Sequence, residues 1–276
     1  MACGKLRRGM DGSHTAAEWD ALLARRDAAA GGAPVPGPLA PLFSPLLAPP
    51  VAADGCFVVG RLAQTLDGRI ATLSGSSRWI GGRGDILHTH RLRALCHAVV
   101  VGAGTVRHDD PLLTTRECPG LSPARVVLDT ERRLGPDRRV FAEGGPPTLL
   151  ACAEDAAPGP DRLGAAEVVR LPRNPVVGGL HLPALLRFLA SRGLPRVFVE
   201  GGGVTVSRFL ASGCLDRLHV TVAPVLLGSG IPAFTLPEAA RSADGLRFEW
   251  TPHALDPDDM LFDIALDRAR PAVCAA

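Results

Sequence analysis

The chain has 276 residues, of which 46% are hydrophobic and 21% are charged, and its formal net charge is +2. This length holds one large domain or two small ones, and the apolar content is sufficient for a sizeable core. The balanced charge and the absence of a basic stripe interleaved with aromatics disfavour a nucleic-acid-binding protein. The sequence contains no uncharged apolar stretch of about 18 residues that would span a membrane. The basic N-terminus also lacks the apolar segment of a secretory signal, so we expect a cytoplasmic protein.

Seven cysteines are scattered along the chain at irregular spacing, and none forms a Cys-x-x-Cys pair. An odd number at such spacing indicates neither a disulfide framework nor a zinc site. Several of them lie in apolar runs and are best interpreted as small core residues. We therefore predict no metal centre.

Residues 1–54 differ in composition from the rest of the chain. A helix is predicted over 16–30, because Thr15 can cap it and Glu18 stands at the third position of a capping box. The stretch 31–50 is rich in Pro, Gly and Ala, which favours an extended linker or a surface strap. Its leucines and Phe43 predict that part of it packs against something. We expect residues 55–268 to form the main domain and 269–276 a tail.

From residue 56 onward, predicted strands alternate with predicted helices. Short apolar runs rich in Val, Leu and Ile are typical of strands buried on both faces of a parallel sheet. The last third of the chain is mainly β, which adds antiparallel strands to such a sheet. The fold class expected is α/β, with a mixed, mostly parallel central sheet and helices on both faces. Strands are predicted at 56–64, 97–102, 125–129, 148–152, 167–171, 196–199, 217–223, 248–253 and 260–266, and helices at 85–95, 182–191 and 204–211.

The most informative segment runs from Val197 to Thr205, where an apolar run ends in Glu200 and is followed by Gly201-Gly202-Gly203. The predicted shape is a strand, a tight turn and the start of a helix. Consecutive glycines allow backbone N–H groups to approach an anion, and a helix N-terminus favours negative charge. This pattern suits a phosphate or pyrophosphate, although a glycine turn without a ligand explains it equally well.

Four further segments carry weaker signals. Asp67-Gly68 predicts a hairpin turn between two strands. A loop at 76–80 contains Trp79, which either packs or stacks on a flat ring. The segment 102–111 follows a buried strand, where open α/β sheets bind ligands, and Arg116 stands shortly after it. His88 and His90, two apart on a predicted helix, do not face each other, so we interpret them as part of a solvated helix face rather than a metal site.

In this order, these motifs resemble the reductase domain of bacterial riboflavin biosynthesis, which is usually fused behind a zinc-dependent deaminase. The resemblance covers roughly residues 56–266. It implies a fold similar to dihydrofolate reductase and NADPH-dependent reduction of 5-amino-6-(5-phosphoribosylamino)uracil. The residues that carry it are Thr65-Leu66-Asp67-Gly68-Arg69, Ser77-Arg78-Trp79-Ile80, Leu92-Arg93-Ala94, Gly104-Thr105-Val106, Asp109 to Thr114, Arg125 to Asp129, Glu200-Gly201-Gly202 and Ala223 to Gly228.

The resemblance also implies roles for individual residues. The family's NADPH contacts match Ala63, Trp79, Thr105, Asp109, Gly202, Gly203, Val204 and Thr205, within a stretch that continues to Arg208. Its contacts to the phosphoribosyl pyrimidine match Ser77, Arg93, Leu113, Arg116 and Glu200. These residue types suit the assignment, since arginine forks bind a sugar phosphate and a carboxylate accepts from ribosyl hydroxyls. Glu200 is the best candidate for a general acid. The expected partner is a small-molecule phosphorylated pyrimidine, and neither a nucleic acid nor a membrane is expected.

Two departures from the family pattern stand out. Arg61 occupies the place of a lysine in the pattern Lys-x-Ala-x-Ser-Leu-Asp-Gly, and a guanidinium does not release its proton readily. The deaminase signature, His-x-Glu followed by Pro-Cys-x-x-Cys, does not occur, so a stand-alone reductase is expected. The alternatives are a reductase of a pteridine or related heterocycle and a non-catalytic nucleotide-binding protein. The family usually forms dimers, and the apolar strap of residues 31–50 could wrap a partner subunit in a homodimer.

Overall fold

The computed structural model describes residues 12–26, 35–77, 80–176, 178–255 and 258–268. They belong to two compact units, which divide between Pro49 and Pro50. The boundary lies near the predicted one at residue 54. Trp79, which the sequence suggested as a cofactor contact, lies outside the described residues.

The first unit contains short helical segments where an extended strap was predicted. Glu18 Oε1 accepts hydrogen bonds from Leu39 N at 2.8 Å and Ala40 N at 2.7 Å, and so caps the start of a helix that is distant in sequence. Trp19 and Phe43 meet edge to face, with ring centroids 5.6 Å apart. The cap and the aromatic contact explain why this Pro-rich stretch turns instead of extending. Its elements are α1 (Gly12–Ala24), α2 (Ala40–Phe43) and the 3₁₀ turn η1 (Ser44–Leu47).

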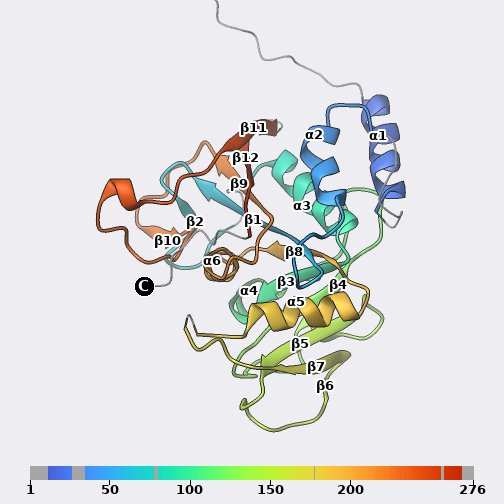
Figure 1. Ribbon diagram of the computed structural model, residues 1–276, viewed down its shortest axis with the longest axis vertical. Coiled ribbons are helices and arrows are strands. Elements are labelled where there is room, and N and C mark those ends of the chain that lie inside the picture. The colour runs from blue at the N-terminus through green and yellow to red at the C-terminus, as the bar shows by residue number, and fades with distance from the viewer. Residues whose placement is uncertain (1–11, 27–34, 78–79, 177, 256–257, 269–276) are drawn as a thin grey trace, which may run out of the picture. The chain divides into compact units, whose positions relative to one another are not determined.

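The second unit is built on a large, mostly parallel sheet with the strand order β11-β12-β9-β1-β8-β3-β4-β5-β7-β6 in its described part (Figure 1). Neighbours from β9 to β7 are parallel, whereas the pairs β11–β12, β12–β9 and β7–β6 at the two edges are antiparallel. This confirms the predicted fold class. The strands are β1 (Phe57–Thr65), β3 (Ala98–Gly102), β4 (Ala124–Leu128), β5 (Thr148–Ala153), β6 (Arg162–Leu163), β7 (Ala166–Leu171), β8 (Arg196–Glu200), β9 (Arg217–Ala223), β11 (Trp250–Leu255) and β12 (Asp259–Ala265).

Helices cover both faces of this sheet because its central strands are apolar on both sides. One face packs into a core with α5 and α6, to which the strands contribute alternate residues such as Val58, Val100 and Val197. The alternate residues along the same strands, such as Phe198 on β8, are buried on the opposite face of the sheet. Helices α3 and α4 contact these strands. The helices are α3 (Arg83–Leu95), α4 (Ala103–Asp109), α5 (Leu182–Ser191) and α6 (Gly203–Ala211), with short 3₁₀ turns η2 (Arg139–Phe141) and η3 (Ser242–Asp244).

The interpretation of His88 and His90 as a solvated helix face is wrong. Their exposed fractions are 2% and 4%, because His88 faces His219 on β9 and His90 faces the loop that carries Arg116. The prediction of a β-hairpin at Asp67-Gly68 is also wrong. The turn forms, but β2 (Arg69–Thr72) pairs with β10 (Gly230–Pro232) instead of β1. The Asp67 carboxylate accepts hydrogen bonds from Leu227 N and Gly228 N, which ties the turn to another loop.

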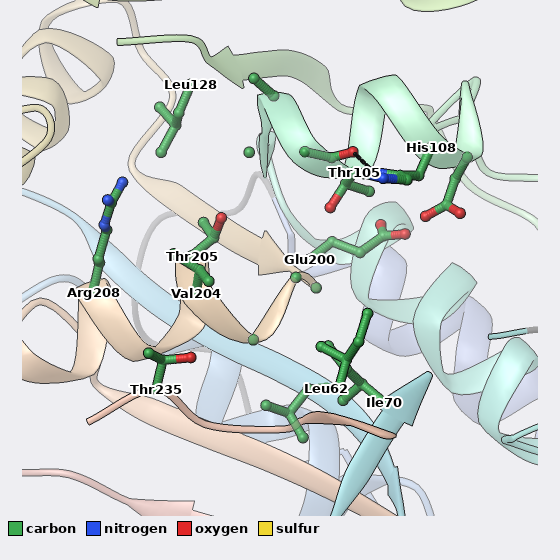
Figure 2. A pocket seen from close by; sticks show the side chains of 18 of the residues that line it. Leu62, Ile70, Thr105, His108, Leu128, Glu200, Val204, Thr205, Arg208 and Thr235 are labelled. Carbon is green, nitrogen blue, oxygen red and sulfur yellow. Dashed lines mark hydrogen bonds between the residues drawn. The ribbon is translucent and has the colours of Figure 1, made fainter. Parts of the chain in front are cut away.

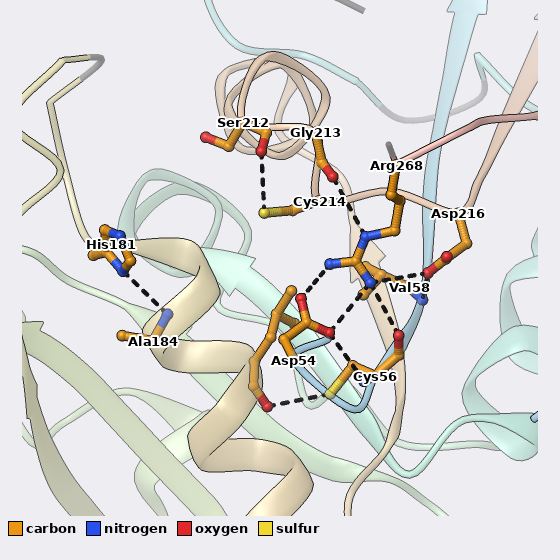
Figure 3. Close-up of polar contacts among 11 residues, drawn as sticks. Asp54, Cys56, Val58, His181, Ala184, Ser212, Gly213, Cys214, Asp216 and Arg268 are labelled. Atoms are coloured by element: carbon orange, nitrogen blue, oxygen red, sulfur yellow. Dashed lines mark hydrogen bonds and ion pairs between the residues drawn. The ribbon is translucent and has the colours of Figure 1, made fainter. Parts of the chain in front are cut away.

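Arg268 ties the last described residues to the start of the main domain (Figure 3). Its guanidinium forms ion pairs with Asp54 and Asp216 and donates to Cys56 O at 3.0 Å. Asp216 also accepts from Val58 N at 2.7 Å. These bonds hold together segments that are more than 200 residues apart, just before β1 and after β12.

Candidate active site

A cavity of about 1240 Å³ opens at the carboxyl ends of four neighbouring parallel strands, β1, β8, β3 and β4 (Figure 2). Open α/β sheets bind ligands at this end. The volume exceeds what one small ligand needs and suits a dinucleotide together with a second molecule. In Figure 2 the side chain of Glu200 projects from the end of β8 into the space that the other labelled residues surround.

The glycine turn after β8 forms the floor of this cavity. Gly201 and Gly202 both have φ of +65°, which favours glycine. At Gly203, the first residue of α6, a Cβ atom would collide with the Ala233 carbonyl oxygen. All three glycines are therefore required by geometry, and they bring backbone N–H groups at a helix N-terminus to the cavity surface.

The loops after β3 and β8 approach each other through two threonines. A Cβ on Gly202 would lie 3.0 Å from Thr105 Oγ1, and a Cβ on Gly102 would lie 2.5 Å from Thr205 Oγ1. Each hydroxyl thus occupies space that the glycine of the other loop leaves open. Both threonines also line the cavity, so the close approach of the loops places two hydroxyl groups beside the glycine turn.

Four ionisable residues form one row across the sheet on the face that α3 covers. Asp263 on β12 pairs in register with His219 on β9, and His219 pairs with Arg61 on β1. Arg61 in turn pairs with Glu200 on β8. The last two residues of the row line the cavity, and the first two are buried behind them.

One stripe of α3 provides a partner for three members of this row. Between the two imidazoles, His88 Nε2 lies 3.1 Å from His219 Nδ1. Burial lowers the pKa of both histidines, so neutral imidazoles are favoured there. The helix therefore crosses β9, β1 and β8 with one polar contact to each strand. The pairs are His88–His219, Asp85–Arg61 and Arg93–Glu200.

Glu200 is held by a two-point ion pair with Arg93. Arg93 Nε donates to Glu200 Oε2 at 2.7 Å, and Nη2 donates to Oε1. The remaining Arg93 nitrogen, Nη1, donates to Thr114 O at 2.8 Å. Arg116 Nη1 contacts the same residue through Thr114 Oγ1 at 2.8 Å. Because all three Arg93 nitrogens have protein partners, this arginine orients Glu200 and the loop that carries Arg116.

The structure brings most of the predicted site residues to one cavity but not all of them. Arg93 and Arg116 do not line it. Arg93 is bonded directly to Glu200, and Arg116 is connected to Arg93 through Thr114. Leu113 is buried and does not line it either, although its φ of +57° is strained for a leucine. Those that line the cavity are Ala63, Ser77, Thr105, Asp109, Glu200, Gly202, Gly203, Val204 and Thr205.

The sequence did not predict two loops that line the cavity on the side of β4, nor one ion pair in its wall. The loop after β4 contributes Thr130 and Arg133, and the loop at 178–180 faces Arg208. No local motif marks those loops. The missed ion pair is Asp85–Arg61, for which the only sequence signal was a carboxylate eight residues before Arg93 on one helix face. No group of three or more His, Cys, Asp or Glu residues in the described ranges is arranged to hold a metal.

The cavity fits a nicotinamide dinucleotide. The glycine turn at the start of α6 is a cradle that a Cβ at Gly202 or Gly203 would narrow, and such a cradle suits a pyrophosphate. Thr105 and Thr205 add hydroxyl donors beside it. Arg133 and Arg208 place positive charge in the same cavity, which favours a phosphorylated ligand.

The family model for the RibD C-terminal domain matches residues 56–262. The chain belongs to this family. The match spans most of the main domain and confirms the family proposed from the ordered motifs. No helix within the described ranges is both long and apolar enough to cross a membrane.

Individual relatives agree with this assignment. The chain is 37% identical over 203 residues to 2,5-diamino-6-ribosylamino-4(3H)-pyrimidinone 5′-phosphate reductase of Methanothermobacter thermautotrophicus, covering 70% of this chain and 90% of that protein. It is 34% identical to the RibD protein of Bacillus amyloliquefaciens, over 62% of this chain and 46% of that one. Acinetobacter baumannii RibD is structurally similar, with a TM-score of 0.66 and 27% identity, over 78% of this chain and 59% of that one. The chain thus spans about half the length of the bacterial RibD proteins that it matches.

Proposed function

We propose that this protein reduces the ribosyl group of a phosphoribosylaminopyrimidine to the ribityl form, with NADPH, in riboflavin biosynthesis. The observation that carries this proposal is the shared cavity in which the glycine turn of α6 and Glu200 lie side by side along the same strand end. The reductase of Methanothermobacter thermautotrophicus, 90% of which is covered by this chain, is named for a phosphorylated ribosylaminopyrimidine, and this supports the same substrate class.

When bound, NADPH supplies the hydride, which joins C1′ of the ribosyl group. The C1′–O4′ bond breaks, O4′ keeps the bonding electron pair and takes up one proton, and the sugar opens to a ribityl chain. The protein orients the cofactor and the pyrimidine relative to each other and excludes water from the cavity. Glycines 202 and 203 with Thr105 and Thr205 hold the cofactor phosphates in this proposal.

Glu200 is the proposed contact to the sugar. Its carboxylate already accepts two hydrogen bonds from Arg93, so it has lone pairs for a ribosyl hydroxyl but serves poorly as a proton donor. The general-acid role expected for Glu200 from the sequence therefore becomes that of an acceptor. Arg116, whose side chain is exposed at the edge of this cluster, is the proposed phosphate ligand.

The direct test follows NADPH consumption by the purified protein. The substrates are 5-amino-6-(5-phosphoribosylamino)uracil, its 2-amino counterpart, their dephosphorylated forms and a dihydropteridine. We expect turnover only with phosphorylated pyrimidines. Turnover of the dihydropteridine alone would favour the pteridine reductase, and nucleotide binding without any turnover would favour a non-catalytic protein.

Arg116→Ala provides a second test. Losing a charge-assisted phosphate contact is expected to raise KM for the pyrimidine at least tenfold, with little change in KM for NADPH. Arg241→Ala, which removes an exposed arginine far along the chain, is the control. An unchanged KM in Arg116→Ala would remove the phosphate role and favour a substrate without phosphate.

We also propose that the protein acts in the cytoplasm as a homodimer. Light scattering should then give a mass of twice the 28.8 kDa of one chain. A mass of one chain at working concentration would exclude the dimer.

A further inference from the structure

The Arg61–Asp85 ion pair has no part in the reaction as described above, although both residues line the cavity. The two side chains are deeply buried, with exposed fractions of 11% and 6%. Arg61 is the register partner of Glu200 on the neighbouring strand, so the pair stands directly beside the proposed sugar contact. Neighbouring strands lie about 4.8 Å apart, which is within the span of one sugar ring.

The pair leaves an unused donor in the cavity wall. Arg61 Nε and Nη2 are both buried and make no hydrogen bond with the residues that the structure describes. Nη2 faces Asp85 Oδ1 in the ion pair, which leaves Nε without any polar partner. A buried donor without a partner is costly unless a ligand or water provides one. Arg93, the equivalent arginine beside Glu200, has protein acceptors for all three of its nitrogens. The unpartnered donor therefore distinguishes Arg61 from Arg93.

The charge balance of this wall indicates the kind of atom that would accept from Arg61. The Arg61 guanidinium faces the Asp85 carboxylate, and Glu200 is compensated by Arg93. The buried carboxylate of Asp259 also interacts with Arg61 and Asp85, so this part of the wall carries no excess positive charge. Such a wall does not attract a phosphate, but a fixed N–H donor beside a carboxylate acceptor matches adjacent oxygens of a sugar. Arg116 is better suited than Arg61 to bind the phosphate, because it has no carboxylate partner in the described part of the chain.

The fold reserves space for the Asp85 carboxylate. Asp85 lies in the first turn of α3, where a negative charge is favoured by the helix dipole. A Cβ atom on Gly81 would collide with the Asp85 carboxyl group. Gly81 has no positive φ, so its lack of a side chain matters for the space it leaves and not for its backbone conformation.

We propose that Asp85 is a positioning residue that holds Arg61 in the cavity wall, where Arg61 Nε–H donates a hydrogen bond to a neutral oxygen of the ribosyl group. This inference rests on the proposed function. It assigns recognition of the sugar to two ion pairs on adjacent strands, one presenting a donor and the other an acceptor.

The first experiment removes the charge of Asp85 while keeping its shape. Asp85→Asn is expected to raise KM for the phosphoribosyl pyrimidine about tenfold, with the NADPH dissociation constant from fluorescence titration unchanged within twofold. Arg61→Met should raise KM at least as much, and Arg61→Lys should recover part of the loss. If the two residues act as one unit, the double variant should be no worse than Arg61→Met.

A second variant perturbs the pair without changing either residue. Gly81→Ala should displace the Asp85 carboxylate and raise the pyrimidine KM in the same direction. The matched control is Asp54→Asn, because the Asp54–Arg268 pair has nearly the same exposed fractions, 8% and 12%, and does not line the cavity. This control should lower the unfolding midpoint and leave both KM values unchanged.

The outcomes separate this inference from the proposed function. If the wild-type protein does not turn over the pyrimidine, the proposed function fails. If it does, a pyrimidine KM within twofold of wild type in Asp85→Asn or Arg61→Met overturns the inference, as do additive effects in the double variant. Should Asp85→Asn fail to fold, Gly81→Ala and Arg61→Met decide the question by the same criterion.

Discussion

Gly202 illustrates how single residues shape the candidate site. Its φ of +65° is costly for any residue with a Cβ, and that Cβ would also lie 3.0 Å from Thr105 Oγ1 at the cavity surface. Two separate effects, backbone strain and loss of space, therefore act at one position. Gly193 has a similar φ of +73°, but a Cβ there would meet no described atom within 4 Å, so this position carries the strain alone.

This pair of glycines gives a matched prediction. Gly202→Ala should weaken NADPH binding at least tenfold, because the new methyl group narrows the phosphate cradle. Gly193→Ala should cost about 1 kcal/mol of stability and leave NADPH binding unchanged. Fluorescence titration and urea unfolding of both variants provide the measurements. Equal NADPH affinities in the two variants would show that the glycine turn does not hold the cofactor.

At the scale of elements, α3 organises the site because its polar stripe lies against the sheet. His90 on this helix accepts a hydrogen bond from Arg116 N at 2.9 Å through Nδ1. Burial, with the positive charge of Arg93 next, lowers the pKa of His90 to about 4. The neutral imidazole therefore holds the backbone of the loop that carries the proposed phosphate ligand.

The lowered pKa makes stability depend on pH. Between about pH 6.5 and pH 4 the unfolded chain binds a proton at His90 and the folded chain does not, so stability falls as the pH decreases. Between pH 7 and pH 5, this difference in proton binding should lower the free energy of unfolding by roughly 2 kcal/mol. His90→Gln should reduce the pH dependence of the urea unfolding free energy, whereas His108→Gln, which changes an exposed histidine, should not. Parallel pH profiles for wild type and His90→Gln would contradict this account.

At the scale of the whole molecule, Arg268 joins the end of the described chain to the start of the main domain. Its removal would leave the carboxylates of Asp54 and Asp216, whose side chains are only 8% and 13% exposed, without a counterion. Leaving a buried charge uncompensated costs about 3–5 kcal/mol, whereas breaking an exposed pair costs below about 1 kcal/mol.

We therefore expect Arg268→Ala to lower the free energy of unfolding by about 3 kcal/mol or more. Arg241→Ala, which breaks the exposed Arg241–Asp244 pair, should change it by less than about 1 kcal/mol. Urea denaturation of the two variants measures this difference. Similar losses in both would mean that the C-terminal strand does not depend on this anchor.

The sequence alone determined most of the elements and the family. The helix at 182–191 and the strand at 217–223 have the predicted bounds, because apolar periodicity and turn residues act locally. The glycine turn after Glu200 was also visible, since a strand, three glycines and a helix start are contiguous. The family followed from motifs whose order along the chain is itself sequence information.

Only the tertiary structure decided which of these residues meet. The sequence did not reveal the pairing of Arg61 with Asp85, although Arg61 departs from the family pattern. The solvent-exposed position predicted for His88 was wrong. The row from Asp263 to Glu200 depends on the register of four strands that are far apart in sequence. Local propensities do not set such a register, because it depends on how the whole sheet packs.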